Sequence, residues 1–203
     1  MHDNQSTTKG GENYEQRSNE EERARPEPRI YVASLSDYNA GRLHGTWIDA
    51  AQEPDEIATE VGAMLASSPT PGAEEYAIHD FEGFGPARLE EYETLESVSA
   101  LARGIAEHGS AFAHYAATTG SRSAEDLANF DEAYLGHFTN IEEYAENLVD
   151  DLGYDDLIER ALPGHLHPYV HFDTEGFARD LELSGDVSTS DGDGGVYVFD
   201  MRS

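Results

Sequence analysis

The chain has 203 residues, enough for one compact domain or two to three small ones. It carries 42 aspartates and glutamates against 12 lysines and arginines, a net charge of −30, which argues against binding nucleic acid or anionic membranes. Cysteine is absent, which excludes disulfides, thiolate metal sites and cysteine nucleophiles. No apolar run is long enough to span a membrane and no signal-peptide pattern is visible, so we expect a cytoplasmic protein.

Residues 1–28 are predicted to be a disordered tail, because they are polar and have little to bury. The tail holds 7 of the 42 acids and 4 of the 12 bases, so Arg29 to Ser203 keeps 35 acids against 8 bases, a net charge of −27. The charge therefore belongs to the folded part of the chain. The 11 tyrosines, 8 phenylalanines and one tryptophan of the sequence suffice to build a core there.

The first predicted unit covers residues 29–90. Its β-branched and aromatic residues predict strands at 29–35, 43–49 and 75–81, with turn signals over 36–41. Pro54 is suited to the first turn of a helix that runs to about Ser68. These elements predict a small antiparallel sheet with one helix.

The middle unit, residues 91–138, is predicted to be helical, with helices that end near Gly109 and Gly120. Ser123 begins a third helix that is expected to include Tyr134 and Leu135. In residues 139–203, Asn140 begins a helix, residues 173–183 form another, and the turn at 191–195 joins two strands in a hairpin. The fold class is therefore α+β, with a mixed C-terminal part.

The acids are dense along the predicted helices. Glu142, Glu146 and Asp150 follow at intervals of four, where each like-charge pair costs about 0.2–0.5 kcal/mol. One such helix has a lower charge density than duplex DNA, but two adjacent helices would match it. An ordinary soluble or salt-adapted surface is the alternative. The predicted partner-binding acids are Glu74, Glu75, Asp80, Glu82, Glu90, Glu91, Glu93, Glu96, Asp126, Glu142, Glu143, Glu146, Asp150, Asp151, Asp155, Asp156 and Glu159.

Three histidines, His165, His167 and His171, lie near Asp173 and could bind zinc, although the prolines around them favour a surface loop. The turn at 191–195 resembles part of a calcium loop, but Arg202 stands where the bidentate glutamate is needed, which favours a hairpin turn. His44 and the His79–Asp80 pair are expected to be packed or hydrogen-bonded. We therefore predict no catalytic residues, metal or cofactor.

Several sequence blocks resemble the ArdA antirestriction family. They are Arg29-Ile-Tyr-Val-Ala-Ser-Leu-Ser-Asp-Tyr-Asn-Ala-Gly-Arg-Leu-His-Gly-Thr-Trp-Ile-Asp49 and Glu75-Tyr-Ala-Ile-His-Asp-Phe-Glu-Gly-Phe84, followed by residues 134–138, 142–146 and 177–186. The resemblance spans about residues 29–199, and the N-terminal tail and the histidine cluster lie outside the family pattern.

The resemblance implies an elongated, curved, three-domain DNA mimic, carried by mobile elements, that acts without catalysis or cofactor. It implies occupation of the DNA-binding groove of Type I restriction–modification enzymes; inhibition of modification stays open. It also implies a homodimer with contacts in the C-terminal part, for which we expect Tyr169, Phe177, Leu181 and Leu183. The alternatives are a halophilic or acidic interaction module, a histidine metal-binding protein, and a hydrolase with paired carboxylates.

Overall fold

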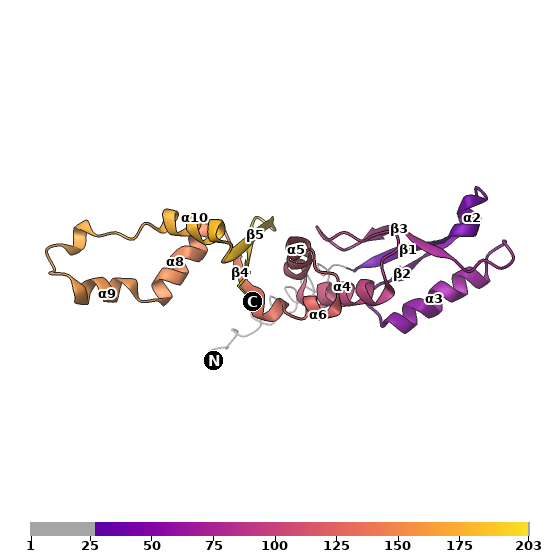
Figure 1. Cartoon of the computed structure of the whole chain (residues 1–203), viewed down its shortest axis with the longest axis horizontal. Helices are drawn as coiled ribbons and strands as arrows, with labels where there is room; N and C mark the ends of the chain where they lie inside the picture. The colour runs from indigo at the N-terminus through magenta and orange to yellow at the C-terminus, as the bar shows by residue number, and fades with distance from the viewer. Residues whose placement is uncertain (1–26, 203) are drawn as a thin grey trace, which may run out of the picture.

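The protein is an elongated molecule in which two small sheets are separated by helices (Figure 1). The computed structural model describes residues 27–202, so nearly all of the predicted tail lies outside the described residues. The mixture of helices and strands confirms the α+β class. The elements are β1 (Arg29–Ser34), α2 (Leu35–Asn39), β2 (Gly45–Asp49), α3 (Pro54–Ala66), β3 (Tyr76–Glu82), α4 (Leu95–His108), α5 (Ser110–Thr119), α6 (Ala124–Leu127), α7 (Phe130–Ala133), β4 (Tyr134–Phe138), α8 (Ile141–Asp151), α9 (Tyr154–Ala161), η1 (His167–Tyr169), α10 (Thr174–Ser184), β5 (Val187–Gly192) and β6 (Gly195–Asp200).

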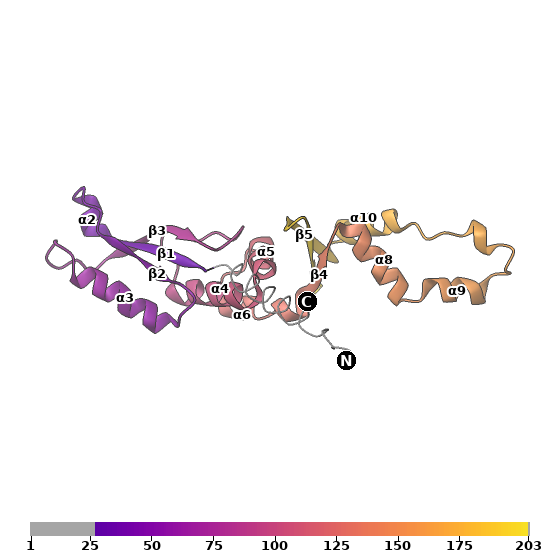
Figure 2. The same cartoon turned by 180° about the vertical axis from the view of Figure 1, so that it is seen from behind.

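The N-terminal sheet is antiparallel, in the order β2-β1-β3, and α3 runs alongside it (Figure 2). The predicted turn at 36–41 is instead the short helix α2, which begins because the Ser34 side chain accepts a hydrogen bond from the Asp37 backbone N–H. Asp37 is fully buried and accepts hydrogen bonds from Ser68 (2.5 Å) and Thr70 (2.6 Å), which hold its pKa well below the usual range. This carboxylate joins α2 to the loop that follows α3.

A continuous apolar core runs from this sheet into the helical middle of the chain. Ile30 and Val32 of β1, Ile57 of α3, and Val98 and Ile105 of α4 are all fully buried within it. The helical periodicity of α4 therefore directs one stripe of apolar residues onto the sheet. The core crosses the predicted boundary at residue 90.

The C-terminal sheet is antiparallel, in the order β4-β6-β5. The prediction that Tyr134 and Leu135 continue a helix is wrong, because both residues lie in β4, where Tyr134 is paired with Phe199 of β6. This pairing crosses the predicted boundary at residue 138. A second, smaller core of Ala145, Ala178, Leu181, Val187 and Val198 joins α8 and α10 to the sheet.

The turn between β5 and β6 is the tight hairpin that the sequence predicts. Asp193 and Gly194 have φ values of 49° and 81°, as the two central residues of a type I′ turn require. The Tyr197 hydroxyl donates a hydrogen bond to the Asp193 carboxylate, which helps to hold the pKa of that carboxyl below its ordinary value.

The two parts of the molecule meet where this hairpin packs against α5. His114 of α5 is buried, and its Nδ1 lies 2.7 Å from the Ser190 hydroxyl of β5. Tyr197 and Phe199 of β6 belong to the first core, together with Tyr115 of α5. We call this contact between α5 and the β5–β6 hairpin the joint.

The joint predicts a pH dependence of stability. Burial lowers the pKa of His114 from its ordinary 6.5, against the opposing pull of Asp193 and Asp191, and His137 lowers it further. Because the folded pKa lies below the unfolded one, His114 stabilises the fold fully above pH 6.5, and this contribution is lost as the pH falls. We expect the difference in free energy of unfolding between wild type and His114→Gln to shrink from about pH 7.5 to about pH 5, measured by denaturant unfolding. A difference that is constant over this range would contradict the buried, neutral His114.

Candidate partner-binding surface

The carboxylates of the described chain are displayed on its surface. Among the aspartates and glutamates of residues 27–202, Asp37 alone is classed as buried. All 17 acids predicted from the sequence to bind a partner are exposed or half-buried. The fold therefore makes these charges available, as a binding surface requires.

The arginines neutralise few of these charges. Seven of the eight arginines in the described chain lie within 4.0 Å of a carboxylate, and their partners are Glu82, Asp37, Glu53, Glu90 and Glu93, Asp156, Glu175, and Asp200. Thirteen of the 17 predicted acids have no arginine of residues 27–202 within that distance. Their charge is available to an external cationic partner.

The densest set of carboxylates lies along α8 and α9, and we call it the α8–α9 strip. Asn140 caps α8, and Gly153, with φ 67°, separates the two helices. No residue of α9 is buried, so this helix depends little on the core. The strip consists of Glu142, Glu143, Glu146, Asp150, Asp151, Asp155, Asp156 and Glu159.

Two of the predicted acids also have structural roles in capping helices. Glu143 accepts a hydrogen bond from the Thr139 backbone N–H at 2.6 Å, which lowers its pKa, and its own N–H donates to Asn140. Asp126 accepts from the Ser123 hydroxyl at 2.7 Å, while its N–H donates to the same oxygen. The spacing Asn140-x-x-Glu143 is a capping signal that sequence reasoning used only to locate the start of the helix.

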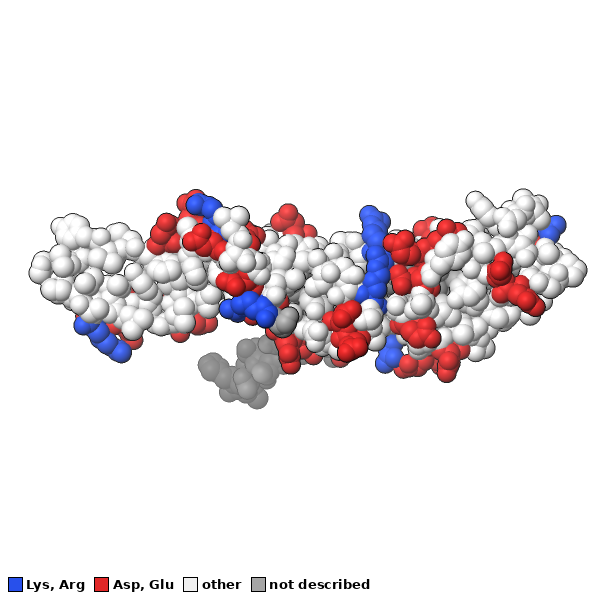
Figure 3. Space-filling view, in the orientation of Figure 1, with Lys and Arg blue, Asp and Glu red and all other residues white. Residues whose placement is uncertain are grey.

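On the face shown in Figure 3, the acids gather in separate patches. One patch lies over the α8–α10 region, and others lie over the helical middle, the N-terminal sheet and α3, with uncharged surface and basic side chains between them. Both parts of the molecule thus contribute negative charge to this face, but the charge does not form a continuous band on it.

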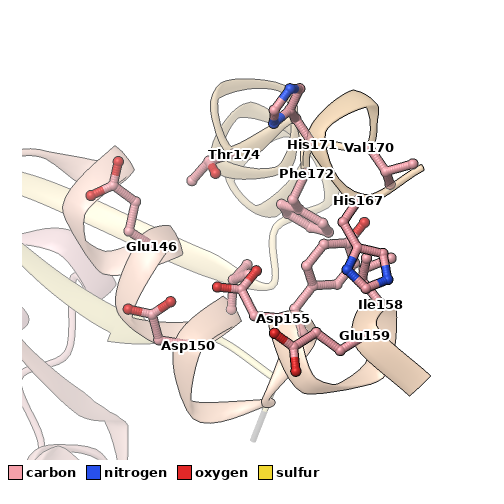
Figure 4. Close-up of a pocket in the computed structure, with 12 residues that line it drawn as sticks. Glu146, Asp150, Asp155, Ile158, Glu159, His167, Val170, His171, Phe172 and Thr174 are labelled. Atoms are coloured by element: carbon pink, nitrogen blue, oxygen red, sulfur yellow. The ribbon is translucent and has the colours of Figure 1, made fainter. Parts of the chain in front are cut away.

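A cavity of about 400 Å³ opens between the α8–α9 strip and the returning segment before α10 (Figure 4). Glu146, Asp150, Asp155 and Glu159 line its strip side, and His171 lies on the opposite side. Apolar walls complete it, from Val149, Ile158, Val170 and Phe172. Sequence reasoning missed this cavity because it depends on how a long irregular segment returns past α9.

The three clustered histidines do not form a metal site in the described chain. His167 Nε2 lies 2.9 Å from the Leu162 carbonyl oxygen, and Asp173 caps α10 by accepting from the Gly176 N–H. Residues 27–202 contain no group of three or more histidines and acids arranged to hold a metal ion. The sequence alternative of a zinc site thus finds no geometric support.

The other candidate histidines have structural partners, as predicted. His44 Nε2 lies 2.8 Å from the Met64 carbonyl oxygen. The His79 ring packs edge-on against Tyr38, with centroids 4.7 Å apart. Neither arrangement indicates acid–base chemistry.

The four residues expected at a dimer interface have different environments. Tyr169 and Leu183 are 80% and 78% exposed, whereas Leu181 is 9% exposed and packs in the second core. Phe177 is half-buried, with its ring 5.3 Å from that of Phe172. Leu181 therefore cannot be replaced without disturbing the fold of a single protomer.

Taken together, these features define an elongated, acidic α+β protein with an exposed carboxylate surface. No helix in residues 27–202 is long and apolar enough to cross a membrane. A comparison with protein families finds that the family model described as "Antirestriction protein (ArdA)" matches residues 30–195. The chain therefore belongs to the ArdA family of antirestriction proteins, as the sequence blocks predict. A comparison with curated proteins finds no match.

Glu143 caps α8, whereas Glu146 is repelled by like charges on the same helix, so substitutions at the two positions should change stability in opposite directions. Glu143→Ala should destabilise the C-terminal part, because the Thr139 N–H loses its acceptor. Glu146→Gln should stabilise it by about 0.4–1 kcal/mol, because it removes two like-charge pairs four residues apart. Denaturant unfolding of both variants measures this difference. Equal effects of the two substitutions would contradict the distinction.

Proposed function

We propose that this protein inhibits Type I restriction–modification enzymes in the cytoplasm by occupying their DNA-binding groove as a mimic of duplex DNA. It acts by binding, without catalysis and without a cofactor. The observation that carries the proposal is the α8–α9 strip, whose exposed carboxylates stand on ordered helices. Membership of the antirestriction family supports the same conclusion.

The spacing of the strip supports mimicry. Eight carboxylates occur within the 18 residues from Glu142 to Glu159. Counted at about 1.5 Å per residue along the path of the two helices, these residues cover about 27 Å, which gives one charge per about 3.4 Å of that path. One strand of B-DNA carries one phosphate per about 3.4 Å of axis. The strip thus has the linear charge density of one DNA strand.

The patches on the N-terminal part extend the proposed interface beyond the strip. A basic DNA-binding groove gains affinity from each neutralised charge and from the counterions that are released. Such a sum does not require a continuous band of carboxylates. Separate patches at suitable distances contact separate basic clusters of the groove, as phosphates on one face of a duplex do.

An acidic or halophilic interaction module without mimicry is the second candidate function. It is favoured by the imbalance of charge, because repulsion among the carboxylates needs salt to screen it. The continuous apolar core from β1 to β6 opposes that alternative, since the burial of apolar side chains stabilises the fold without any need to screen charge. Unfolding in dilute buffer would support the halophilic candidate, and a stable fold there would eliminate it.

Charge neutralisation on the strip tests the proposed mimicry. A single change such as Glu146→Gln should weaken binding to a Type I methyltransferase core by less than about 1 kcal/mol, because one exposed charge contributes little. The combination of Glu142→Gln, Glu146→Gln, Asp150→Asn and Glu159→Gln should cost about 1–4 kcal/mol. Titration calorimetry at fixed salt measures both.

A matched variant separates position from total charge. Asp55→Asn, Glu107→Gln, Glu132→Gln and Asp180→Asn remove the same charge from exposed acids outside the predicted set. This control should bind more tightly than the strip variant. Equal losses of binding affinity in the strip variant and the control variant would show that only total charge matters. Abolition of binding by one substitution would indicate a discrete site.

We also propose that the protein is a homodimer through its C-terminal part. Of nine exposed large hydrophobic residues in the described chain, five lie between residues 152 and 183, namely Leu152, Leu157, Leu166, Tyr169 and Leu183. Such a concentration is typical of an interaction surface. Two protomers joined there present two acidic strips to the enzyme.

The dimer is tested with charge at the exposed positions. Tyr169→Glu and Leu183→Glu should shift the protein toward monomer in sedimentation velocity, because each introduces a charge into an apolar contact. Leu43, which is 75% exposed near the other end of the molecule, provides the control Leu43→Glu. Unchanged sedimentation of the first two variants would argue against this interface.

A further inference from the structure

The joint between α5 and the β5–β6 hairpin contains a polar network that the proposed binding surface does not use. His114 lies on the face of α5 that contacts the hairpin. Its Nδ1 lies 2.7 Å from Ser190 Oγ of β5, and within the hairpin the Tyr197 hydroxyl donates a hydrogen bond to the Asp193 carboxylate. A polar side chain of α5 therefore contacts the hairpin of the other part.

Aromatic stacking reinforces this network. The ring of Tyr197 lies 4.6 Å from that of His114 in a stacked arrangement, and the His137 ring lies at the same distance. His137 Nε2 is also 3.0 Å from the Gly192 carbonyl oxygen, which joins β4 to β5. In the apolar part of the joint, Phe199 is fully buried and its ring lies 5.5 Å from that of Tyr115.

The contact is too close to admit extra atoms. A Cβ added at Gly192 would lie 2.5 Å from His114 Nε2 and 2.9 Å from the Tyr197 ring. A Cβ at Gly195 would lie 2.2 Å from the Phe138 carbonyl oxygen. The glycines of the hairpin thus permit close packing as well as the turn, which explains their number in a segment that resembles a calcium loop.

The charged patches lie on both sides of the joint, so its angle sets their separation. The α8–α9 strip lies on one side, and the acids of β3 and of the segment up to α4 lie on the other (Figure 1). A rotation of about 10° moves the end of an arm about 27 Å long by about 5 Å. That displacement exceeds the 3.4 Å spacing of phosphates along one strand. A joint without a fixed angle would therefore move the carboxylates away from the positions that match the basic groups of a groove.

We propose that Ser190 and His114 are positioning residues, which fix the angle between the two acidic parts so that both can engage one groove. The inference rests on the proposed function for its consequence in binding. The geometry of the joint is a property of the free protein and is measured without any partner.

The sequence has no cysteine, so two introduced cysteines give a clean pair of spin labels. Ala63 of α3 and Asn147 of α8 are exposed and lie on opposite sides of the joint. The full chain carrying Ala63→Cys and Asn147→Cys is spin-labelled and diluted with unlabelled chain. Double electron–electron resonance then measures the distance between the two labels within one protomer. We expect a single narrow distance in the otherwise wild-type protein.

Ser190→Ala and, independently, His114→Gln should broaden that distance distribution. Thr189→Val is the matched control, because the Thr189 hydroxyl bonds to Glu182 within the C-terminal part at 2.6 Å. It should leave the distance unchanged. Near-ultraviolet circular dichroism confirms that each variant is folded.

Competition with DNA for a Type I methyltransferase core supplies the second readout, in which Ser190→Ala should bind more weakly than Thr189→Val. A narrow distance distribution in both Ser190→Ala and His114→Gln would contradict the proposal that these two residues fix the angle of the joint. Broadened distances with unchanged competition would overturn the positioning role while leaving the proposed function intact. Failure of the wild type to compete, with the distance changes as expected, would overturn the proposed function and support the joint alone.

Discussion

Repulsion among carboxylates is the constraint on which the rest of this structure depends. Residues 29–203 carry a net charge of −27, and seven of the eight arginines in the described chain are already used in local ion pairs. Exposed ion pairs contribute at most about 1 kcal/mol each, so they cannot hold such a chain together. The fold instead depends on two apolar cores, which bury the aromatic and β-branched residues while the acids remain outside.

This division explains the elongated shape. A compact arrangement would bring all the acids within a few screening lengths of one another, whereas two cores in series spread them along the molecule. In the proposed function the same arrangement serves recognition, since a DNA-binding groove is itself long. The two parts are connected at the joint, where Phe199 belongs to the first core and His114 of α5 contacts Ser190 of β5.

Much of the fold follows from local sequence signals. The helical periodicity of α3 and α4, the cap at Asn140 and the Asp193-Gly194 turn were each predicted because neighbouring residues determine them. The start of β4 was wrongly assigned to a helix, because Tyr134 is held in a strand by Phe199, which lies far away in sequence. The same reason explains why the buried His114 gave no sequence signal, since its partner Ser190 comes 76 residues later. For the site, the exposure of the acids could be predicted, but the structural roles of Glu143 and Asp126 depend on hydrogen bonds that composition does not reveal.

In the proposed function, ordered carboxylates replace the phosphates of DNA in the groove of a Type I enzyme. A competition measurement tests it most directly: labelled duplex DNA bound to a Type I methyltransferase core is titrated with the full-length protein at several salt concentrations. DNA mimicry predicts complete, mutually exclusive displacement of the DNA, with an affinity that falls steeply as salt rises. Formation of a ternary complex, in which DNA and protein bind the enzyme together, would contradict it.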